Sequence, residues 1–472
     1  MRNVYTGILV VGCMLMHPTS VFGQCEPNEV QKLFASDGDP DDHFGWEMSI
    51  WKDTAIIGVP LDDDNGTNAG SAYVYQKIRD EWVEMAKLLP AEVEEQDRFG
   101  VFVSIFGDTI LVSATADDDN GSDAGAVYVF EKIDGVWIQI AKLLASDGEA
   151  SDRFGSFVSI FGETISVGAQ ADDDNGLNAG AVYVFEKIDD VWIQVTKLLA
   201  SDGEQYDELG RSGCMWEDTM VIGAIQDDDL ALNSGAAYVF EKVGGVWQEV
   251  AKLTAADGGY LDELGWRVSV HGDTALIGAH KDDENGFHSG SAYVFERVDG
   301  KWKQTAKLLA SDGEEEDTFG FKLNVVGNTA IVGAWREGEN KPPYDYPHTG
   351  AAYVFHKTGS VWAETEKLTA SDADDEDRFG VSVSIHGDSV LVGAYNDDDN
   401  GEDSGAIYVI DLNCVPPCPW DLDGSGSVGA SDLLALLVSW GPCKGCPADF
   451  DGNGTVGASD LLALLVNWGP CP

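Results

Sequence analysis

Short apolar runs separated by polar turn residues recur along most of the chain. Residues 99–153 read FGVFVSIFGDTILVSATADDDNGSDAGAVYVFEKIDGVWIQIAKLLASDGEASDR. Four runs in this stretch are rich in Val, Ile, Tyr and Phe and are bounded by turn residues, a pattern typical of β-strands. A two-residue Gly-Asp turn between the first two runs predicts a tight hairpin. The expected strands are residues 101–105, 109–114, 126–132 and 137–144.

The same pattern returns seven times, and each unit begins with a Phe-Gly or Leu-Gly pair. Successive pairs lie 55 residues apart five times and then 60, because the sixth unit carries the insertion GENKPPYDYPHTG. Four strands in each unit with no helix between them predict an all-β, seven-bladed β-propeller. The pairs are Phe44-Gly45, Phe99-Gly100, Phe154-Gly155, Leu209-Gly210, Leu264-Gly265, Phe319-Gly320 and Phe379-Gly380.

The count of strands predicts how the ring closes. Only six units are followed by a fourth strand, and the last unit stops after its third strand, AIYVIDLN. A seventh copy of the fourth strand precedes the first pair, in EVQKLFASDGD at residues 29–39. We therefore expect residues 24–413 to form the propeller, with the N-terminal strand completing the last blade and protecting its edge. The six fourth strands carry Trp82, Trp137, Trp192, Trp247, Trp302 and Trp362, which we expect to pack between blades.

The pair Phe99-Gly100 and the stretches VGA and GAVYVF resemble the FG-GAP repeat family, which includes the propeller of integrin alpha chains. The resemblance covers about residues 29–412 and implies a propeller used for adhesion or ligand binding. Many family members carry a D-x-D-x-D-G-x-x-D calcium loop between the first two strands of a blade. Here that connection is only GDT or similar, so the family's calcium sites are not expected in this propeller.

The loop between the second and third strands of most units contains the acidic run DDDNG. Strands of a blade alternate in direction, so these loops and the acidic links between blades are expected on one face of the disc. Turn chemistry is the favoured interpretation, because Asp, Asn and Gly suit tight turns. Weak cation binding and recognition of a partner stay open; for a partner, the deviating fourth and sixth loops, the latter with Tyr344 and Tyr346, are the better candidates. The candidate cation ligands are Asp117, Asp118, Asp119, Asp172, Asp173, Asp174, Asp397, Asp398 and Asp399.

The charge balance limits the possible partners. The 472 residues include 83 acidic and 28 basic ones, a formal net charge of −55. Nucleic acids and anionic membranes would be repelled and are excluded as partners. Apolar residues make up 44 % of the chain, which is too many for a disordered acidic tail. The histidines follow no ligand spacing, and no nucleophile–base pair or cofactor motif is recognisable, so we expect no enzyme.

Residues 1–23 predict a secretory signal peptide. Arg2 precedes an apolar run that is too short to span a bilayer, and small residues follow it. VVGC at Cys13 also resembles a lipoprotein cleavage site, but the apolar run continues past it, which makes lipoprotein anchoring the less favoured alternative. No later segment is apolar enough to cross a membrane. We therefore expect a secreted, extracellular or cell-surface protein.

After a linker at residues 414–420 the composition changes to two related segments. They are DLDGSGSVGASDLLALLVSWGPC and DFDGNGTVGASDLLALLVNWGPC. Each begins as a calcium loop with oxygen ligands at positions 1, 3, 5, 7 and 12 and Gly at position 6, and continues into one apolar helix. The predicted Ca²⁺ ligands are Asp421, Asp423, Ser425, Ser427 and Asp432 in the first loop and Asp449, Asp451, Asn453, Thr455 and Asp460 in the second.

Asp at position 12, with a single helix after each loop, resembles the dockerin type I module. The resemblance covers residues 418–472, of which we assign 421–472 to the domain. It implies calcium-dependent folding and docking to a cohesin-like receptor or another envelope protein, often on carbohydrate-degrading assemblies. The polar pair that dockerins place after position 9 is Ala430-Ser431 and Ala458-Ser459 here, so the partner stays open.

Export makes disulfides permissible for the remaining cysteines. Cys418–Cys443 and Cys446–Cys471 each bracket one calcium repeat with the same spacing of 25. Cys25 and Cys414 flank the two strands expected to pair in the shared blade, so a Cys25–Cys414 bridge would lock the ring. Cys214 is left as a buried free thiol.

The sequence therefore predicts an exported, non-catalytic propeller that binds an unknown protein or glycan and is attached through a calcium-stabilised tail. Two alternatives stay open. One is a carbohydrate-active or accessory component of polysaccharide degradation, suggested by the usual partners of dockerins. The other is a structural envelope protein without a specific ligand.

Overall fold

The computed structural model divides the chain into two compact units, Glu26–Asn413 and Met1–Cys25 with Cys414–Pro472. It describes residues 27–92, 94–338, 348–412, 420, 422, 427–442, 448, 450 and 454–470. The predicted signal peptide, Cys13, Tyr344 and Tyr346 lie outside the described residues.

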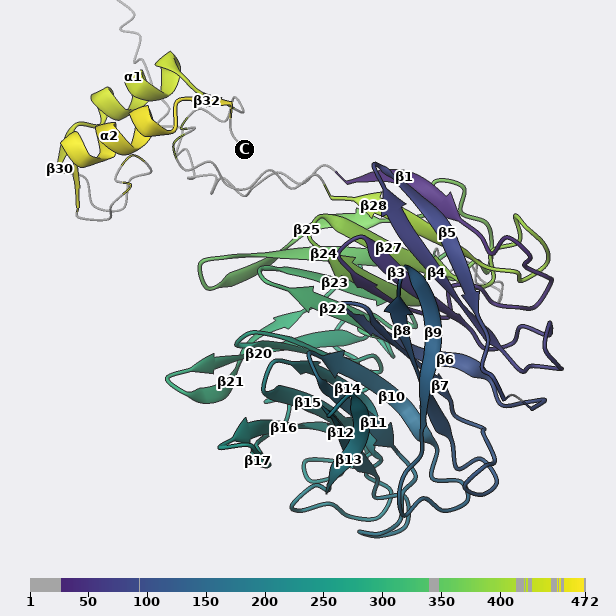
Figure 1. Ribbon diagram of the computed structural model, residues 1–472. Helices are drawn as coiled ribbons and strands as arrows, with labels where there is room; N and C mark the ends of the chain where they lie inside the picture. The colour runs from purple at the N-terminus through teal and green to yellow at the C-terminus, as the bar shows by residue number, and fades with distance from the viewer. Residues whose placement is uncertain are drawn as a thin grey trace, which may run out of the picture. The chain divides into compact units, whose positions relative to one another are not determined.

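The larger unit consists of seven antiparallel four-stranded sheets arranged in a ring (Figure 1). In the second blade the strands are β6 (Phe99–Phe106), β7 (Thr109–Ala114), β8 (Ala126–Ile133) and β9 (Val136–Leu143). The innermost strands contact one another all the way round, including β26 (Ser382–His386) with β2 (Glu47–Trp51). The prediction of an all-β, seven-bladed propeller is confirmed.

The other blades repeat this order from the axis outward. The first contains β2, β3 (Thr54–Val59), β4 (Ser71–Ile78) and β5 (Glu81–Leu88); the third β10 (Phe154–Phe161), β11 (Thr164–Ala169), β12 (Ala181–Ile188) and β13 (Val191–Leu198); the fourth β14 (Leu209–Trp216), β15 (Thr219–Ala224), β16 (Ala236–Val243) and β17 (Val246–Leu253). The fifth contains β18 (Val268–His271), β19 (Thr274–Ala279), β20 (Ser291–Val298) and β21 (Lys301–Leu308); the sixth β22 (Lys322–Val326), β23 (Thr329–Ala334), β24 (Ala351–Thr358) and β25 (Val361–Leu368).

The N-terminal strand closes the ring, as predicted. The seventh blade has the order β1-β28-β27-β26, in which β1 (Asn28–Leu33) is the outer strand beside β28 (Ala406–Asp411) and β27 (Ser389–Ala394) lies next to β26. The strands β1 and β28 pair antiparallel, from Asn28 opposite Asp411 to Leu33 opposite Ile407. Cys25 and Cys414 lie outside the described residues, so their disulfide stays a prediction.

The Phe-Gly pair joins each blade to the one before it. Phe99 is fully buried and lies edge-on against Tyr128 of its own blade, with 5.4 Å between ring centroids. Its backbone N–H donates to the carbonyl of Ala69 in the first blade over 2.9 Å. Gly100 has a φ of +106°, and a Cβ there would lie 2.4 Å from the carbonyl oxygen of Ser71. Only glycine lets the two blades approach this closely.

The hydrophobic cores lie between blades. Trp192 of the third blade, for example, packs in one cluster with Leu111 and Val129 of the second. This confirms the predicted inter-blade role of the fourth-strand tryptophans. Cys214 on β14 is a free thiol that is half-buried, and burial raises its pKa.

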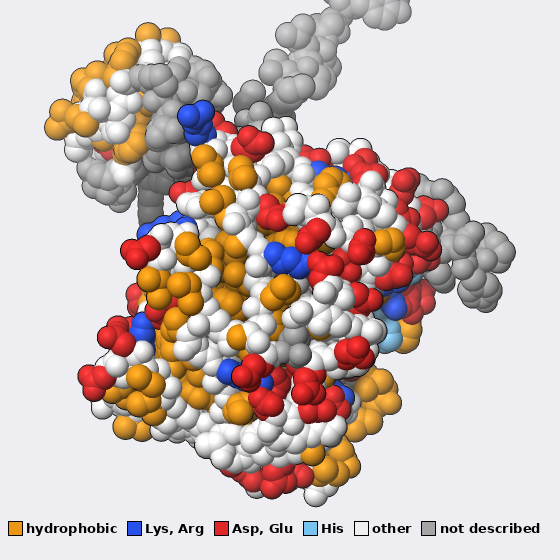
Figure 2. All heavy atoms as spheres, turned by 45° about the vertical axis from the view of Figure 1, so that its right-hand side comes forward, with side chains coloured by type: hydrophobic (Ala, Val, Ile, Leu, Met, Phe, Trp, Pro, Cys, Tyr) orange, Lys and Arg blue, Asp and Glu red, His pale blue; other side chains and the backbone are white. Residues whose placement is uncertain are grey.

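The loops between the second and third strands lie on the same face as the links between blades. Ser151 in the link after the second blade donates its N–H to Ser122 over 2.7 Å, and Phe154 donates to Ala124 over 2.8 Å. The predicted gathering of acidic segments on one face is therefore confirmed. Acidic side chains predominate over basic ones on much of the surface shown in Figure 2.

The C-terminal unit contains two short helices, α1 (Ala430–Val438) and α2 (Ala458–Val466), in a two-fold repeat. Short strands pair crosswise, β29 (Ser427–Val428) with β32 (Gly469–Pro470) and β30 (Gly441–Pro442) with β31 (Thr455–Val456). Its small core comprises Val428, Leu436, Ala448, Val456 and Leu464. Within the described ranges, neither helix has the length and apolar character needed to cross a membrane.

Candidate functional site

The acidic loops of the propeller are built around a lysine. In the third blade, the ammonium of Lys197 lies 2.7 Å from Asp172, 2.5 Å from Asp174 and 3.2 Å from Asp147, which belongs to the link before the blade. Asp172 is 2 % exposed and also accepts the hydroxyl hydrogen of Tyr183 over 2.7 Å. We call this group of a lysine, a tyrosine and the surrounding carboxylates the lysine box.

A lysine box occurs in every blade. In six blades the lysine lies 2.7–3.0 Å from the first carboxylate of its loop and 2.5–3.2 Å from the third. In the sixth blade, whose loop deviates, Lys367 pairs with Asp312 and Glu337 instead. The box lysines are Lys32, Lys87, Lys142, Lys197, Lys252, Lys307 and Lys367, and the tyrosines are Tyr73, Tyr128, Tyr183, Tyr238, Tyr293, Tyr353 and Tyr408.

The ion pairs of the box decide its protonation. Burial alone would lower the pKa of Lys197, but its bonds to Asp172 and Asp174 outweigh this effect and raise the pKa above the usual value. Burial alone would raise the pKa of Asp147, whereas Tyr183 and Lys197 hold it below the usual value. The box is therefore an ionised network near neutral pH.

The structure places the predicted propeller cation ligands in these loops. Asp117, Asp172 and Asp397 are the buried first carboxylates, and Asp119, Asp174 and Asp399 the third ones, all bonded to the box lysine. Asp118 and Asp398 each accept the backbone N–H of the residue five positions later, over 2.7 Å, and Asp173 occupies the equivalent position.

A metal ion in these loops would have to displace the lysine ammonium. In the part of the chain that the structure describes, no group of three or more His, Cys, Asp or Glu side chains has the arrangement of a metal site. Weak cation binding at the DDDNG loops stays a prediction.

A second set of carboxylates is buried in the links between blades. Asp152 is 5 % exposed and accepts the backbone N–H of Glu149 over 2.7 Å. Burial, only partly offset by this bond, raises the pKa of Asp152 to about 6. The equivalent aspartates with a pKa raised to about 6 are Asp42, Asp97, Asp207, Asp262 and Asp377, and that of Asp317 is raised to about 7.

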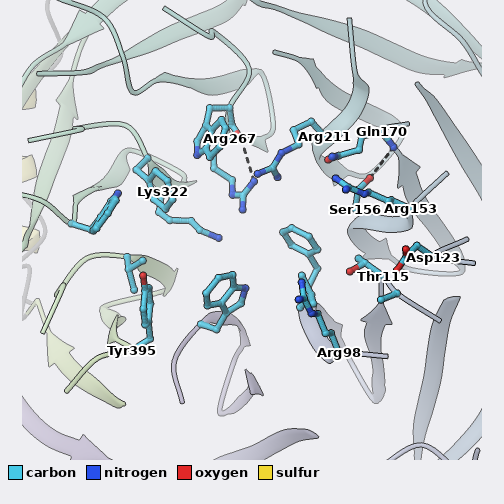
Figure 3. Close-up of a pocket in the computed structure, with 18 residues that line it drawn as sticks. Arg98, Thr115, Asp123, Arg153, Ser156, Gln170, Arg211, Arg267, Lys322 and Tyr395 are labelled. Carbon is cyan, nitrogen blue, oxygen red and sulfur yellow. Dashed lines mark hydrogen bonds between the residues drawn. The ribbon is translucent and has the colours of Figure 1, made fainter. Parts of the chain in front are cut away.

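Positions that differ between units line a cavity at the mouth of the central channel. The residue after the Phe-Gly pair is Trp, Val, Ser, Arg, Trp, Phe and Val in successive units. All seven blades contribute to this cavity, which has a volume of about 480 Å³. Its lining includes the loop residues Thr115, Gln170 and Tyr395, so it lies on the face that carries the acidic loops; Figure 3 shows the lining side chains. It is the candidate binding site of the propeller.

Basic side chains predominate in the cavity, although the protein is strongly acidic. Its lining contains Arg98, Arg153, Arg211, Arg267 and Lys322 but one carboxylate, Asp123.

Three of these cations come from neighbouring blades. Arg211 lies on β14, Arg267 directly before β18 and Lys322 at the start of β22, and all three extend toward the middle of the cavity (Figure 3). Lys322 forms an ion pair with Glu47 of β2, whose Oε2 is also 3.9 Å from Arg267. The first and sixth blades are not neighbours, so the Glu47–Lys322 pair reaches across the channel.

The crowding of positive charge changes the proton affinities. Burial, reinforced by the Arg267 guanidinium, lowers the pKa of Lys322 to about 7 and that of Arg211 to about 9. Burial also lowers the pKa of Arg267. The pKa values fall because the nearby negative charge does not fully balance these buried positive charges.

Aromatic rings form much of the remaining wall. Phe321 lies between Trp266 and Trp335, with centroid distances of 5.5 and 5.6 Å, and Trp46 lies 5.3 Å from Tyr395. The guanidinium of Arg211 stacks 4.5 Å from the centre of the Trp266 ring. Such a wall suits a ligand with flat or apolar faces.

This site was not predicted from the sequence, because the candidate ligands were expected in the loops. No motif marks the cavity, since its residues are spread from Trp46 to Tyr395. The sequence signal that could have indicated the cavity is the set of residues that directly follow each Phe-Gly or Leu-Gly pair. At this position and the next one, Arg211, Arg267 and Lys322 stand where most other units have small or apolar residues and the first unit has Glu47.

The described part of the predicted calcium loops shows their last ligand. Asp432 is fully buried and accepts the backbone N–H groups of Leu422 and Gly429, each over 2.7 Å. Asp460 is equally buried and accepts those of Phe450 and Gly457 over 2.8 Å. In both copies the position-12 carboxylate therefore accepts two backbone N–H groups of described residues, and calcium binding by these loops stays a prediction.

The backbone of Ser427 and residue Thr455 belong to the short strands β29 and β31. The other predicted calcium ligands and the tail disulfides Cys418–Cys443 and Cys446–Cys471 lie outside the described residues. These ligands are Asp421, Asp423, Ser425, Asp449, Asp451 and Asn453.

Comparison with known proteins gives one family. Seven segments match the FG-GAP repeat, residues 27–75, 82–130, 137–185, 192–240, 247–295, 302–355 and 362–410. Each match contains the outer strand of one blade and the three inner strands of the next, so the sequence repeat is offset from the blade by one strand. No curated protein matches the chain.

Substitution of a box lysine should destabilise the propeller strongly. Lys197→Met leaves Asp172 buried without its ammonium, and breaking a buried ion pair in this way costs about 3 kcal/mol. Lys301→Met on the outer strand β21 is the matched control, because Lys301 is exposed. Urea unfolding of both variants measures the difference. Equal stability of the two would show that the box contributes little.

The link aspartates predict greater stability at mildly acidic pH. Their pKa is about 6 in the folded protein and near 3.8 when unfolded, so the folded state binds more protons in between. The free energy of unfolding should therefore rise as pH falls from about 8 to about 5, by on the order of 1 kcal/mol for each aspartate. It should fall again at lower pH, where carboxylates such as Asp147 become protonated.

Calorimetry across this pH range tests the prediction. Asp152→Asn removes one of the seven titrating groups and should reduce the rise. A melting temperature that falls steadily below pH 7 would contradict it.

Proposed function

Because this chain belongs to the FG-GAP repeat family, we propose that it is a binding or adhesion protein with its ligand site in the channel-mouth cavity. The observation that carries the proposal is that the seven units differ in sequence at positions that line the cavity. Residues that hold the blades together recur in every unit, such as the buried tyrosine of the third strand. Although Arg98 and Arg153 are equivalent, most positions lining the cavity do not carry one residue type in all units, as a site for one asymmetric ligand requires.

The composition of the cavity favours recognition without catalysis. Cations and aromatic rings can hold and orient a ligand, whereas general acid–base catalysis needs a titrating group beside the reacting atoms. Lys322, whose pKa is lowered to about 7, is such a group in the lining, but it is ion-paired with Glu47. Asp123 is the carboxylate among the described lining residues, and they include no His or Cys. A carbohydrate-active role is the second candidate, because the aromatic wall suits sugar rings. A purely structural envelope role is the third.

We further propose that the protein is exported, with residues 1–23 as the signal peptide, and that its tail is a calcium-binding, dockerin-like module. Asp421, Asp423, Ser425, Ser427 and Asp432 would hold one ion, and the second loop would use its equivalents. Calcium would neutralise the carboxylates that each loop brings together, so that binding free energy becomes folding free energy.

The tail also has surfaces suited to docking. On α1, Leu434, Leu437 and Val438 are 62, 49 and 80 % exposed. The equivalent positions on α2, residues 462, 465 and 466, are exposed to 63, 47 and 76 %. Figure 2 shows hydrophobic side chains on the surface of this unit. These paired apolar faces support attachment to a cohesin-like receptor or another envelope protein.

The ligand proposal predicts that filling the cavity abolishes binding. Thr115→Trp places a bulky side chain in the cavity, and the backbone tolerates it because the equivalent residue of the sixth unit is Trp335. Val136→Trp on the outer edge is the control, since Val136 is 60 % exposed. The wild type and both variants are applied to an array of glycans and peptides with a parallel assay for hydrolysis.

Binding that is lost in Thr115→Trp but kept in Val136→Trp, without turnover, supports the proposal. Turnover of a bound glycan would favour the carbohydrate-active alternative. Absence of binding to the whole array would favour the structural one.

The tail is expected to need calcium for its fold. Limited proteolysis of the full-length chain should cleave within residues 413–472 when a chelator is present and spare them when calcium is in excess. The described propeller residues, 27–92, 94–338 and 348–412, should resist the protease in both conditions, because the lysine boxes use an internal cation. The same cleavage of the tail with and without calcium would contradict the proposed calcium loops.

A further inference from the structure

The charge in the channel-mouth cavity is opposite to that of the rest of the protein. The surface is strongly acidic, yet Arg211, Arg267 and Lys322 converge on the middle of the cavity (Figure 3). Placing three cations side by side in a partly buried site is unfavourable unless negative charge balances them. An anion bound between the cations would reduce their mutual repulsion and stabilise this arrangement.

The protein itself supplies part of this negative charge. Glu47 pairs with Lys322, and Glu208 and Glu263 lie close enough to raise the pKa of Arg211 against the effect of burial. Glu208 and Glu263, however, also have other partners. Glu208 accepts a hydrogen bond from Gln226 over 2.5 Å, and Glu263 lies 2.5 Å from the ammonium of Lys281.

Arg211 is thereby available to a ligand. Its guanidinium stacks on Trp266 and forms no side-chain hydrogen bond within the part of the chain that the structure describes. A guanidinium has five N–H donors in a planar fork that fits a carboxylate through two parallel hydrogen bonds. Arg267 uses Nη1 for the carbonyl of Trp266 over 3.2 Å, and Nη2 is 3.9 Å from Glu47.

Two indole N–H groups of the wall are also unused. The Nε1 atoms of Trp266 and Trp335 are buried and have no hydrogen-bond partner among the described residues. A ligand with an apolar ring face and polar edges would satisfy both the rings and these donors.

The size of the cavity and its surroundings limit the anion. About 480 Å³ accommodates one or two rings, in the range of ordinary small-ligand sites. The face around the mouth carries the acidic loops of seven blades, and the formal net charge is −55. A polyanion would be repelled before it reached the cavity, whereas a ligand with one negative charge would not be repelled strongly.

We propose that the channel-mouth cavity binds a single carboxylate carried on a ring, with Arg211 and Arg267 holding the carboxylate and the aromatic wall facing the ring. The inference rests on the proposed ligand site and specifies its ligand class. Two sources share this chemistry, a hexuronic acid at the end of an acidic glycan and a small aromatic carboxylic acid.

Titration calorimetry of the full-length protein tests the charge requirement with ligands alone. The probes are glucuronate, galacturonate, their neutral methyl esters, glucose and benzoate. We expect at least one carboxylate to bind ten times or more tightly than its neutral counterpart. Preference for a uronate identifies a glycan source, and preference for benzoate identifies an aromatic acid.

Variants then test the residues. Arg211→Met and Arg267→Met should each weaken the carboxylate at least tenfold, and Arg211→Lys should restore only part of the affinity, because an ammonium lacks the planar fork. Lys301→Met is the control with an equal loss of charge far from the site. Melting temperatures identify any variant that fails to fold, and the ligand comparison in the wild type does not depend on them.

The outcomes separate this inference from the proposed function. Equal binding of acids and neutral counterparts, lost in Thr115→Trp, would overturn the anion inference and leave the ligand site in place. Failure of all six probes to bind would overturn the anion inference, while the array still decides whether the cavity binds anything. Tighter binding of a polyuronate chain than of the monomer would overturn the argument from the acidic rim.

Discussion

One ammonium group in each blade allows the acidic face of this propeller to fold. The first carboxylate of each DDDNG loop is buried, and a buried carboxylate is tolerated only when it is paired. The box lysine provides that pair, and it also bonds the exposed third carboxylate and, in most blades, an aspartate from the preceding link. Seven of the 28 basic residues serve in this way. The loop, the outer strand and the link to the neighbouring blade are thereby fixed relative to one another.

The strand pattern and the closure of the ring could be predicted because both depend on local order along the chain. Turn residues mark strand ends, and counting the fourth strands shows that one stands before the first unit. The lysine box could not be predicted in the same way. Lys197 follows Asp174 by 23 residues and lies on a strand whose exposed positions are the apolar Val191, Ile193 and Val195, so the strand pattern does not mark the lysine. Its pairing depends on where the loop folds back.

The channel-mouth cavity could not be predicted from the sequence for a different reason. It exists only when seven blades have closed, and then it combines single residues from units hundreds of positions apart. Arg267 and Lys322 both occupy the second position after the Leu-Gly or Phe-Gly pair of their units. Taken alone, each would be interpreted as an exposed residue at the start of a strand. When the ring closes, these basic residues come together and form one concentration of positive charge on an otherwise acidic face. That contrast is a property of the assembled disc and of no single segment.

The position of β1 in the seventh blade has a consequence for synthesis. Asn28 leaves the ribosome among the first residues of the propeller, and its partner Asp411 among the last. The first strand must therefore remain unpaired while six blades are made, and a chain interrupted before β28 leaves β1 without its partner. Completion of the last blade thus reports that the whole propeller has been translated, and an interrupted product exposes a free sheet edge to the proteases and chaperones that recognise unfinished proteins.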